Sequence, residues 1–312
     1  MMTSIRPRAF SVFALRYLHR TVAVVSGLAL TVVAAGLYAR ASWATALWPW
    51  PDVRMTYIFL ASVLAAAIAP SIWIGVTGEL AVLAPGALNT LFLNLMFAAY
   101  LGARGLRRDE PKLLVAAAVN LAVVPFFVSL RRRSRAIPVK DTRPMPRLVT
   151  FAMWTICGLL VVVGIPLLIQ VDNVFPWSLT PQTSTIFGCV FLGAAGYFAY
   201  VARWPYWVFG LAPLLGFFAY DLVLFTPYID LLRRPAGGFS GSSASYGGYY
   251  GSYGTTVTGN GVNEWSLAVY LAVIGVSAVF AAVFLFLNPA TRLRVRSFSG
   301  LRQLPLLARH AA

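Results

Sequence analysis

The chain alternates long apolar blocks with short polar gaps. A helix needs about twenty consecutive apolar residues to cross a bilayer, and eight blocks of about that length occur. They predict transmembrane helices near residues 21–39, 56–76, 80–102, 113–130, 148–170, 184–202, 206–226 and 265–288. Apolar residues make up 59% of the chain and charged residues 11%, far too few for the surface of a water-soluble globule. We therefore expect an all-α, polytopic transmembrane helix bundle.

Three short landmarks occur twice in the same order. Trp-Pro-Trp at 48–50 is answered by Phe-Pro-Trp at 175–177, Leu-Ala-Pro at 83–85 by the same tripeptide at 211–213, and Leu-Arg-Arg at 106–108 by Leu-Arg-Arg at 232–234. The members of each pair lie 127, 128 and 126 positions apart. This near-constant offset indicates a tandem duplication into two parallel four-helix repeats. The expected organisation is a basic N-terminus 1–20, repeat 1 at 21–130, a basic linker 131–147, repeat 2 at 148–288 and a basic tail 289–312.

Basic residues are concentrated in three of the gaps. The chain holds 25 Lys and Arg against 9 Asp and Glu, and the N-terminus, the linker and the tail carry most of the excess. Even numbers of spans separate these segments, so the positive-inside rule places all three in the cytoplasm together. The charge is then suited to the anionic headgroups of membrane lipids. Nucleic acid is not an expected partner, because no basic surface domain exists to hold its phosphates.

One gap does not follow this rule. Residues 103–112 must be external in the eight-span arrangement, yet the segment contains Arg104, Arg107, Arg108 and Lys112. A re-entrant segment 56–102 that crosses only once is the alternative, but it would reverse the second half against a larger charge bias. The second copy also carries Arg233 and Arg234 at the matching position. The external arginine pairs, which have no obvious orienting purpose, are therefore candidate sites for lipid or partner contact.

Residues 236–263 consist mainly of Gly, Ser and Tyr. Such a segment buries too little apolar surface to offset the entropy of ordering it, which favours a flexible external loop. A tyrosine-rich adhesive surface and a lid over the bundle are the alternatives.

Carboxylates and amides at membrane depth are the remaining candidates for function, because polar groups there need partners. Asp221 lies about five residues before the expected outer end of its helix; alternatively, that helix ends early and Asp221 is interfacial, paired with Arg233 or Arg234. Glu79 falls in a short interhelical link, where a solvated turn is the competing interpretation. The amides of Asn89, Asn94 and Asn120 are expected to hydrogen-bond across helices.

Catalytic and cofactor motifs are not found. The two histidines, His19 and His310, lie near opposite ends of the chain, and Cys157 and Cys189 fall inside spans without nearby partners. We therefore expect no enzyme activity, no metal and no cofactor. Pro85 and Pro213 lie at matching positions, and helices broken at matching positions are typical of transporters.

The segment Leu47-Trp48-Pro49-Trp50-Pro51, followed by Leu83-Ala84-Pro85-Gly86-Ala87-Leu88, resembles a group of uncharacterised bacterial membrane proteins with a Trp-Pro-Trp-Pro-Leu-Thr-Pro-Leu signature. The second copy keeps Leu179-Thr180-Pro181, whereas the first has Asp52-Val53-Arg54. The resemblance implies a bacterial cytoplasmic membrane and attaches no function.

These patterns favour a non-catalytic membrane protein that serves as a structural or accessory component of a membrane assembly or envelope process, with a membrane protein as partner. A small transporter or lipid-handling permease, with a site between the two repeats, is the alternative.

The orientation is directly testable with topology reporters. Fusions after Arg135 and after Arg296 should both report the cytoplasm, because basic segments are retained on that side. A periplasmic signal at either point would contradict the eight-span arrangement.

Overall fold

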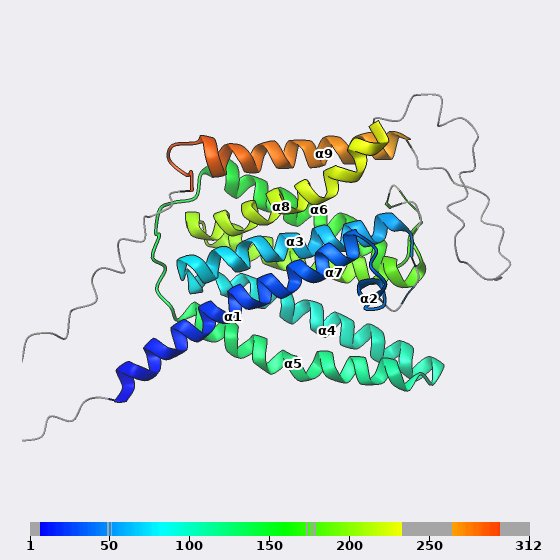
Figure 1. Cartoon of the computed structure of the whole chain (residues 1–312), viewed down its shortest axis with the longest axis horizontal. Coiled ribbons are helices and arrows are strands. Elements are labelled where there is room, and N and C mark those ends of the chain that lie inside the picture. The colour runs from blue at the N-terminus through cyan, green and yellow to red at the C-terminus, as the bar shows by residue number, and fades with distance from the viewer. Residues whose placement is uncertain are drawn as a thin grey trace, which may run out of the picture.

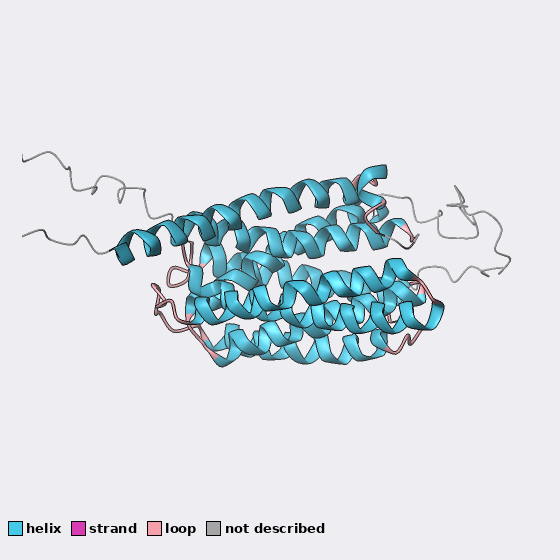
Figure 2. Ribbon diagram, turned by 90° about the horizontal axis from the view of Figure 1, so that it is seen from below, coloured by secondary structure: helices cyan, strands magenta, loops and turns pink. Residues whose placement is uncertain are grey.

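The protein is a bundle of long helices whose axes run roughly along one direction (Figures 1 and 2). The computed structural model describes residues 7–293, except 49, 51, 173, 176, 178 and 233–263, with side chains described over 17–227 and 268–293. Within these residues eight helices are long and apolar enough to cross a membrane. The predicted fold class is thus confirmed, and the chain is a multi-pass membrane protein.

The N-terminal half contains four of the spans and two short turns. Its elements are α1 (Pro7–Tyr38), α2 (Ser42–Thr45), α3 (Arg54–Thr77), the 3₁₀ turn η1 (Leu80–Val82), α4 (Leu83–Arg108) and α5 (Pro111–Arg135). The start of α1 differs most from expectation. The helix begins at Pro7, although its apolar span begins only at Tyr17, because a helix can extend beyond the apolar part that crosses the membrane.

The C-terminal half contains the other four spans. Its elements are α6 (Arg147–Leu168), α7 (Pro181–Arg203), α8 (Trp207–Leu232), α9 (Glu264–Ala282) and the π-helical turn η3 (Val283–Leu287). The expected Gly/Ser/Tyr loop at 236–263 lies outside the described residues. The start of α1, residues 136–146 and the end of η3 all lie at one end of the bundle, which we call the linker end (Figure 1). The opposite end carries the described residues of 46–53 and of 169–180, and we call it the elbow end.

Helix pairing follows one pattern in both halves. Neighbours along the chain pair as α1 with α3, α4 with α5, α6 with α7, and α8 with α9. The two central helices of each half also pack on the other half, since α3 lies against α8 and α4 against α7. The halves are therefore joined through these four central helices.

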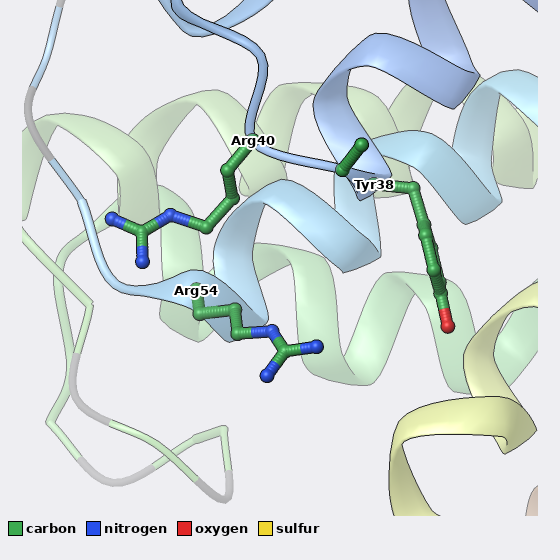
Figure 3. Close-up of a pocket in the computed structure, with 4 residues that line it drawn as sticks. Tyr38, Arg40 and Arg54 are labelled. Atoms are coloured by element: carbon green, nitrogen blue, oxygen red, sulfur yellow. The ribbon is translucent and has the colours of Figure 1, made fainter.

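The C-terminal ends of α1 and α6 have the same backbone geometry. At the end of α1, the N–H of Ala41 bonds to the carbonyl of Gly36 and the N–H of Arg40 to that of Leu37. This is a Schellman motif, and it places Arg40 at a φ of 55°, in the left-handed region (Figure 3). A side chain in this conformation costs about 1 kcal/mol relative to glycine. Gln170 occupies the corresponding position after α6, with a φ of 62°.

Residues 136–146 bind to several elements at the linker end. The N–H of Met145 donates to the carbonyl of Pro205, and the N–H of Trp207 donates to that of Arg143. The Arg143 side chain is paired with Asp141 at 2.6 Å and also donates to the carbonyl of Ala290. The connection between the halves is therefore attached to the turn between α7 and α8 and to the chain after α9.

The contact between α3 and α8 can be tested at one glycine. A Cβ on Gly216 would lie 2.7 Å from the carbonyl oxygen of Ala66, whereas a Cβ on Gly275 would meet no atom within 4 Å. We expect Gly216→Ala to destabilise the protein by about 1–3 kcal/mol through overpacking, and the matched Gly275→Ala to leave stability unchanged or slightly raised. Thermal unfolding, followed by the reaction of a thiol dye with the buried Cys189, measures both. Equal stability of the two variants would contradict close packing at this crossing.

Candidate functional site

The central helices of the two halves approach each other closely at two glycines, and we call these two contacts the crossings. Gly216 of α8 lies against the backbone of Ala66 in α3. On the other side, Gly193 of α7 lies against Asn89 of α4, since a Cβ there would be 2.9 Å from the Asn89 Oδ1. Small residues let membrane helices approach closely, and van der Waals packing then holds them together. Both crossings thus place one helix of each half in direct contact.

Aromatic rings fill the space between the halves toward the elbow end. Phe59 of α3 is fully buried and has ring contacts with Phe175, Phe187 and Phe191, with centroids 4.6–5.9 Å away. Trp177 and Tyr220 also contact Phe59, at 6.2 and 6.1 Å. These distances are those of favourable aromatic pairs. A side chain of the N-terminal half is therefore enclosed by rings of the C-terminal half.

A buried carboxylate joins the halves at the elbow end. Asp52 is 8% exposed, and its Oδ1 accepts from the N–H of Val53 and from the Thr56 hydroxyl, each at 2.8 Å. Its Oδ2 accepts from the Thr183 hydroxyl at the start of α7. Trp177 donates its indole N–H to the Thr56 hydroxyl at 3.3 Å. We call Asp52, Thr56, Thr183 and Trp177 the elbow cluster.

Burial and hydrogen bonding act on Asp52 in opposite directions. Desolvation raises the pKa of this carboxyl above its ordinary value of 3.8, while the bonds from Thr183, Thr56 and Val53 partly offset the rise. The folded protein therefore binds a proton at Asp52 more readily than the unfolded chain does. The cluster is thus a set of hydrogen bonds between the halves, and its contribution to the stability of the folded protein depends on pH.

Two cations hold the C-terminal end of α3 at the linker end. Arg20 of α1 donates to the carbonyls of Gly75 and Val76 at 2.9 and 2.7 Å. Lys140 donates to the carbonyls of Thr77 and Gly78 at 3.1 and 2.8 Å. The last carbonyls of a helix lack intrahelical partners and carry partial negative charge, so this is where cations stabilise a helix. Lys140 thereby fixes the connection between the halves to α3.

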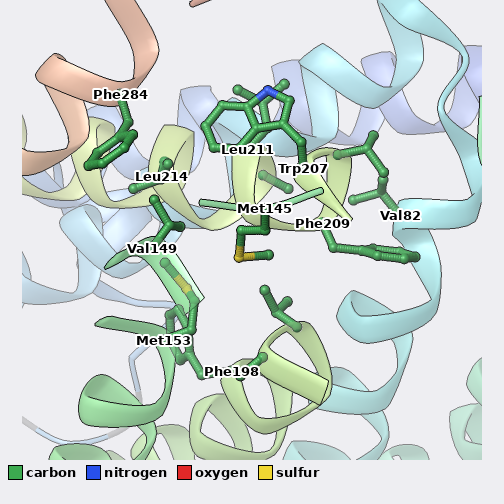
Figure 4. Close-up of a cluster of buried hydrophobic side chains, with 14 of the residues drawn as sticks. Val82, Met145, Val149, Met153, Phe198, Trp207, Phe209, Leu211, Leu214 and Phe284 are labelled. Atoms are coloured by element: carbon green, nitrogen blue, oxygen red, sulfur yellow. The ribbon is translucent and has the colours of Figure 1, made fainter. Parts of the chain in front are cut away.

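A large apolar cluster lies behind this cap. It contains side chains of η1, α6, α7, α8 and η3, and Trp207 at its centre is 1% exposed. Figure 4 shows Met145, which precedes α6, near the centre of the view, with Val149 on its left and Val82 of η1 on its right. The turn between α3 and α4 therefore packs into the C-terminal half.

Asp221 lies inside the bundle. The helix α8 continues to Leu232, so the alternative in which it ends early is wrong. The residue is 2% exposed, it is hydrogen-bonded to the Ser277 side chain of α9, and its Oδ2 has no partner in the described part of the chain. A buried oxygen without a partner is costly and requires an explanation. The expected pairing with Arg233 or Arg234 concerns residues outside the described range.

The three asparagines do not form the expected set of interhelical bonds. Asn94 donates to the carbonyl of Thr90 and Asn120 to that of Ala116, each four residues earlier in the same helix. This local bond satisfies an amide N–H without a second helix, which is why the expectation is wrong for these two. Asn89 is placed against another helix, at Gly193 of α7.

The remaining candidates lie at helix ends. Glu79 directly follows Gly78, which ends α3 with a φ of 70°, and is partly buried in the turn before η1. Arg107 and Arg108 are exposed in the last turn of α4, where cations favour the helix dipole, so they have a structural reason to be there. Pro85 lies in the first turn of α4, where its missing N–H breaks no bond. Pro85 therefore does not interrupt its helix, whereas Pro213 lies inside α8.

Asp52 is not among the residues predicted from the sequence, although its position carries a usable signal. An aspartate just before a helix and four residues ahead of a threonine can accept bonds from the backbone and from that hydroxyl. Its third bond, from Thr183, joins residues 131 positions apart, which no local pattern predicts.

The arrangement defines a class of protein rather than a reaction. Eight spans, a closely packed interface between halves and a polar joint at the elbow end belong to a multi-pass α-helical membrane protein. Among the described residues no group of three His, Cys, Asp or Glu is placed to hold a metal ion. A scan against protein-family models and searches of curated proteins and of solved structures found no match.

The elbow cluster makes stability depend on pH. Because the folded pKa of Asp52 is raised, its favourable contribution is complete below the unfolded pKa and is lost as pH rises through the folded value. The apparent melting temperature of the wild type relative to Asp52→Asn should therefore be higher at pH 4 than at pH 8.

The matched variant Asp52→Leu keeps the branching of the side chain and removes the acceptors. It leaves the Thr56 and Thr183 hydroxyls without their acceptor, which should lower stability by about 2–4 kcal/mol at either pH. An identical pH dependence in wild type and Asp52→Asn would show that another group titrates.

Proposed function

We propose that the protein is a non-catalytic structural or accessory component of a membrane assembly or envelope process in a bacterial cytoplasmic membrane. The observation that carries this is the interface between the halves. It is packed at both helix crossings, filled with rings around Phe59, and held by the elbow cluster at one end and by Lys140 at the other. A part of an assembly needs a fixed shape, and these contacts favour one.

We infer further that the two halves are copies of one four-helix unit. Ala66 and Gly193 are 127 positions apart, and so are Asn89 and Gly216. Exchanging the halves at this offset converts the contact of Gly216 with Ala66 into that of Gly193 with Asn89. The pairing of α3 with α8 becomes that of α7 with α4 in the same way. Both copies enter from the same side, so the relating axis runs along the membrane normal.

One observation favours the second candidate, a small transporter or lipid-handling permease. The unpartnered Oδ2 of Asp221 is the kind of intramembrane group that binds a coupling ion or substrate. The offset of 127 places Asn94 opposite it in the first half, so the carboxylate belongs to one half alone. Alternating access would require the halves to rock against each other, and the packed crossings oppose this motion.

One experiment separates the two candidates. The tagged full-length chain, extracted in mild detergent, should retain a stoichiometric membrane-protein partner. Asp221→Asn should leave that partner bound, because Asp221 is buried, whereas charge reversal at the exposed Arg107 and Arg108 should release it. Reversal at Arg233 and Arg234 provides the matching test in the second half.

The same variants, reconstituted in vesicles, test transport. Flux of a solute that is present in the wild type and absent in Asp221→Asn, at equal expression and equal melting temperature, would overturn the accessory role. Retention of no partner in wild type and variants alike would also count against it.

A further inference from the structure

Two arginines line a pocket at the elbow end. The pocket has a volume of about 420 Å³ and is lined by Tyr38, Ala39, Arg40 and Arg54. Tyr38 is the last residue of the first span and Arg54 the first of the second. Both arginines therefore lie at the height where a span meets the headgroups of the membrane. Figure 3 shows the Arg40 side chain just after α1 and the Arg54 side chain at the start of α3, with their guanidinium groups directed to opposite sides of the view, while the Tyr38 hydroxyl points to α8, where it bonds to Thr226.

Neither guanidinium has a hydrogen-bond or salt-bridge partner among the described side chains. The nearest acid in sequence, Asp52, is occupied by Val53, Thr56 and Thr183. Arg54 also stands at the first position of α3, where the positive end of the helix dipole disfavours a cation. Positive charge is thus collected around one pocket, and no anion among the described side chains balances it.

The positions in the second half that correspond to Arg40 and Arg54 are occupied by uncharged residues. Gln170 has the same left-handed conformation after α6 as Arg40 has after α1, and its side chain donates to the Thr185 hydroxyl of α7 at 3.1 Å. The position 127 residues after Arg54 is Pro181, which is uncharged. Both residues thus have a strained, positive φ. The Gln170 side chain forms an internal hydrogen bond, whereas the Arg40 side chain lines the pocket. Strain retained without an internal contact is typical of a binding residue.

We propose that Arg40 and Arg54 together bind the phosphate of an anionic membrane lipid at the elbow end. Arginine is suited to phosphate because its planar fork of N–H donors forms paired, charge-assisted bonds. The ligand is a lipid rather than a solute because the pocket opens between two span ends, where headgroup phosphates are concentrated. A net negative headgroup neutralises part of the charge of the two guanidinium groups, whereas a zwitterionic headgroup adds no net charge.

The test counts bound lipid on the intact chain. The purified full-length protein is titrated in detergent with phosphatidylglycerol, and the bound lipids are resolved by native mass spectrometry. The double variant Arg40→Gln with Arg54→Gln should lose the tightest phosphatidylglycerol site, with binding weakened about tenfold or more. Arg107→Gln with Arg108→Gln removes the same charge from exposed positions at the end of α4 and should leave that site intact. Equal loss in both double variants would overturn the proposal, because it would show attraction by net charge alone.

Two further arms identify the ligand. Phosphatidylcholine carries the same phosphodiester with a cation attached and should bind weakly; binding equal to that of phosphatidylglycerol contradicts the requirement for negative charge. Inorganic phosphate should fail to displace phosphatidylglycerol from this site. Displacement at millimolar phosphate would assign the pocket to a soluble anion and overturn the assignment to a lipid.

The variant Arg40→Gly separates binding from folding. Glycine adopts the left-handed conformation without strain, so this change should raise the melting temperature by a few degrees in phosphatidylcholine while weakening phosphatidylglycerol binding. A lowered melting temperature in phosphatidylcholine would show that Arg40 stabilises the fold itself, and the proposal would fail.

Discussion

Close approach of helices at two crossings is the constraint on which the bundle depends. Lipid tails are as apolar as the side chains of the helices, so burial from water does not drive these spans together within the bilayer. Association must come from van der Waals contact, and contact is best where a missing side chain lets the backbones meet. Gly216 at Ala66 and Gly193 at Asn89 provide this, one on each side of the interface. The pairs formed by neighbouring helices would otherwise be four separate hairpins.

The ends of the interface are held by a different interaction. Where α3 begins and where it ends, backbone and hydroxyl groups would lose their partners unless polar side chains from other helices supplied them. Asp52 accepts bonds at the start, and Arg20 with Lys140 donates at the finish. Charges of opposite sign thus stand at opposite ends of one helix. Because Lys140 belongs to the connection between the halves and Thr183 to the second half, α3 is attached at both ends to segments beyond its own hairpin.

The two buried carboxylates show how differently the same group can be treated. Asp52 accepts from three donors, so its burial strengthens a joint between segments distant in sequence. Asp221 has the Ser277 side chain on one oxygen and no partner within the described chain on the other. A fully bonded carboxylate fixes a structure, whereas an incompletely bonded one leaves a demand that a proton, water or ligand can meet. Asp52 therefore stabilises the fold, whereas Asp221 has an oxygen that remains able to bind a proton, a water or a ligand.

The sequence predicts the spans because hydrophobic length is a local property, and all eight blocks are helices long and apolar enough to cross a membrane. It does not predict which helices meet, because a span that is apolar on every side has no face that marks its partner. Asn94 and Asn120 illustrate the difficulty, since a carbonyl four residues back satisfies their amides as well as a neighbouring helix would. Asp52 is readable in part, through Thr56 in its own helix, but Thr183 becomes its partner only after the halves meet.

The differences between the halves are more informative about function than their similarities. Matching contacts at the crossings serve packing, and packing alone accounts for residues such as Gly193 and Gly216. At the elbow end the same backbone turn carries Gln170 in one half and Arg40 in the other, and only the glutamine is bonded within the described fold. A fold with one internal requirement at both turns would have kept the same solution, or glycine, in each. The arginine is thus explained by something that meets the first half from outside, and the membrane interface at the ends of the first two spans is the surface that reaches it.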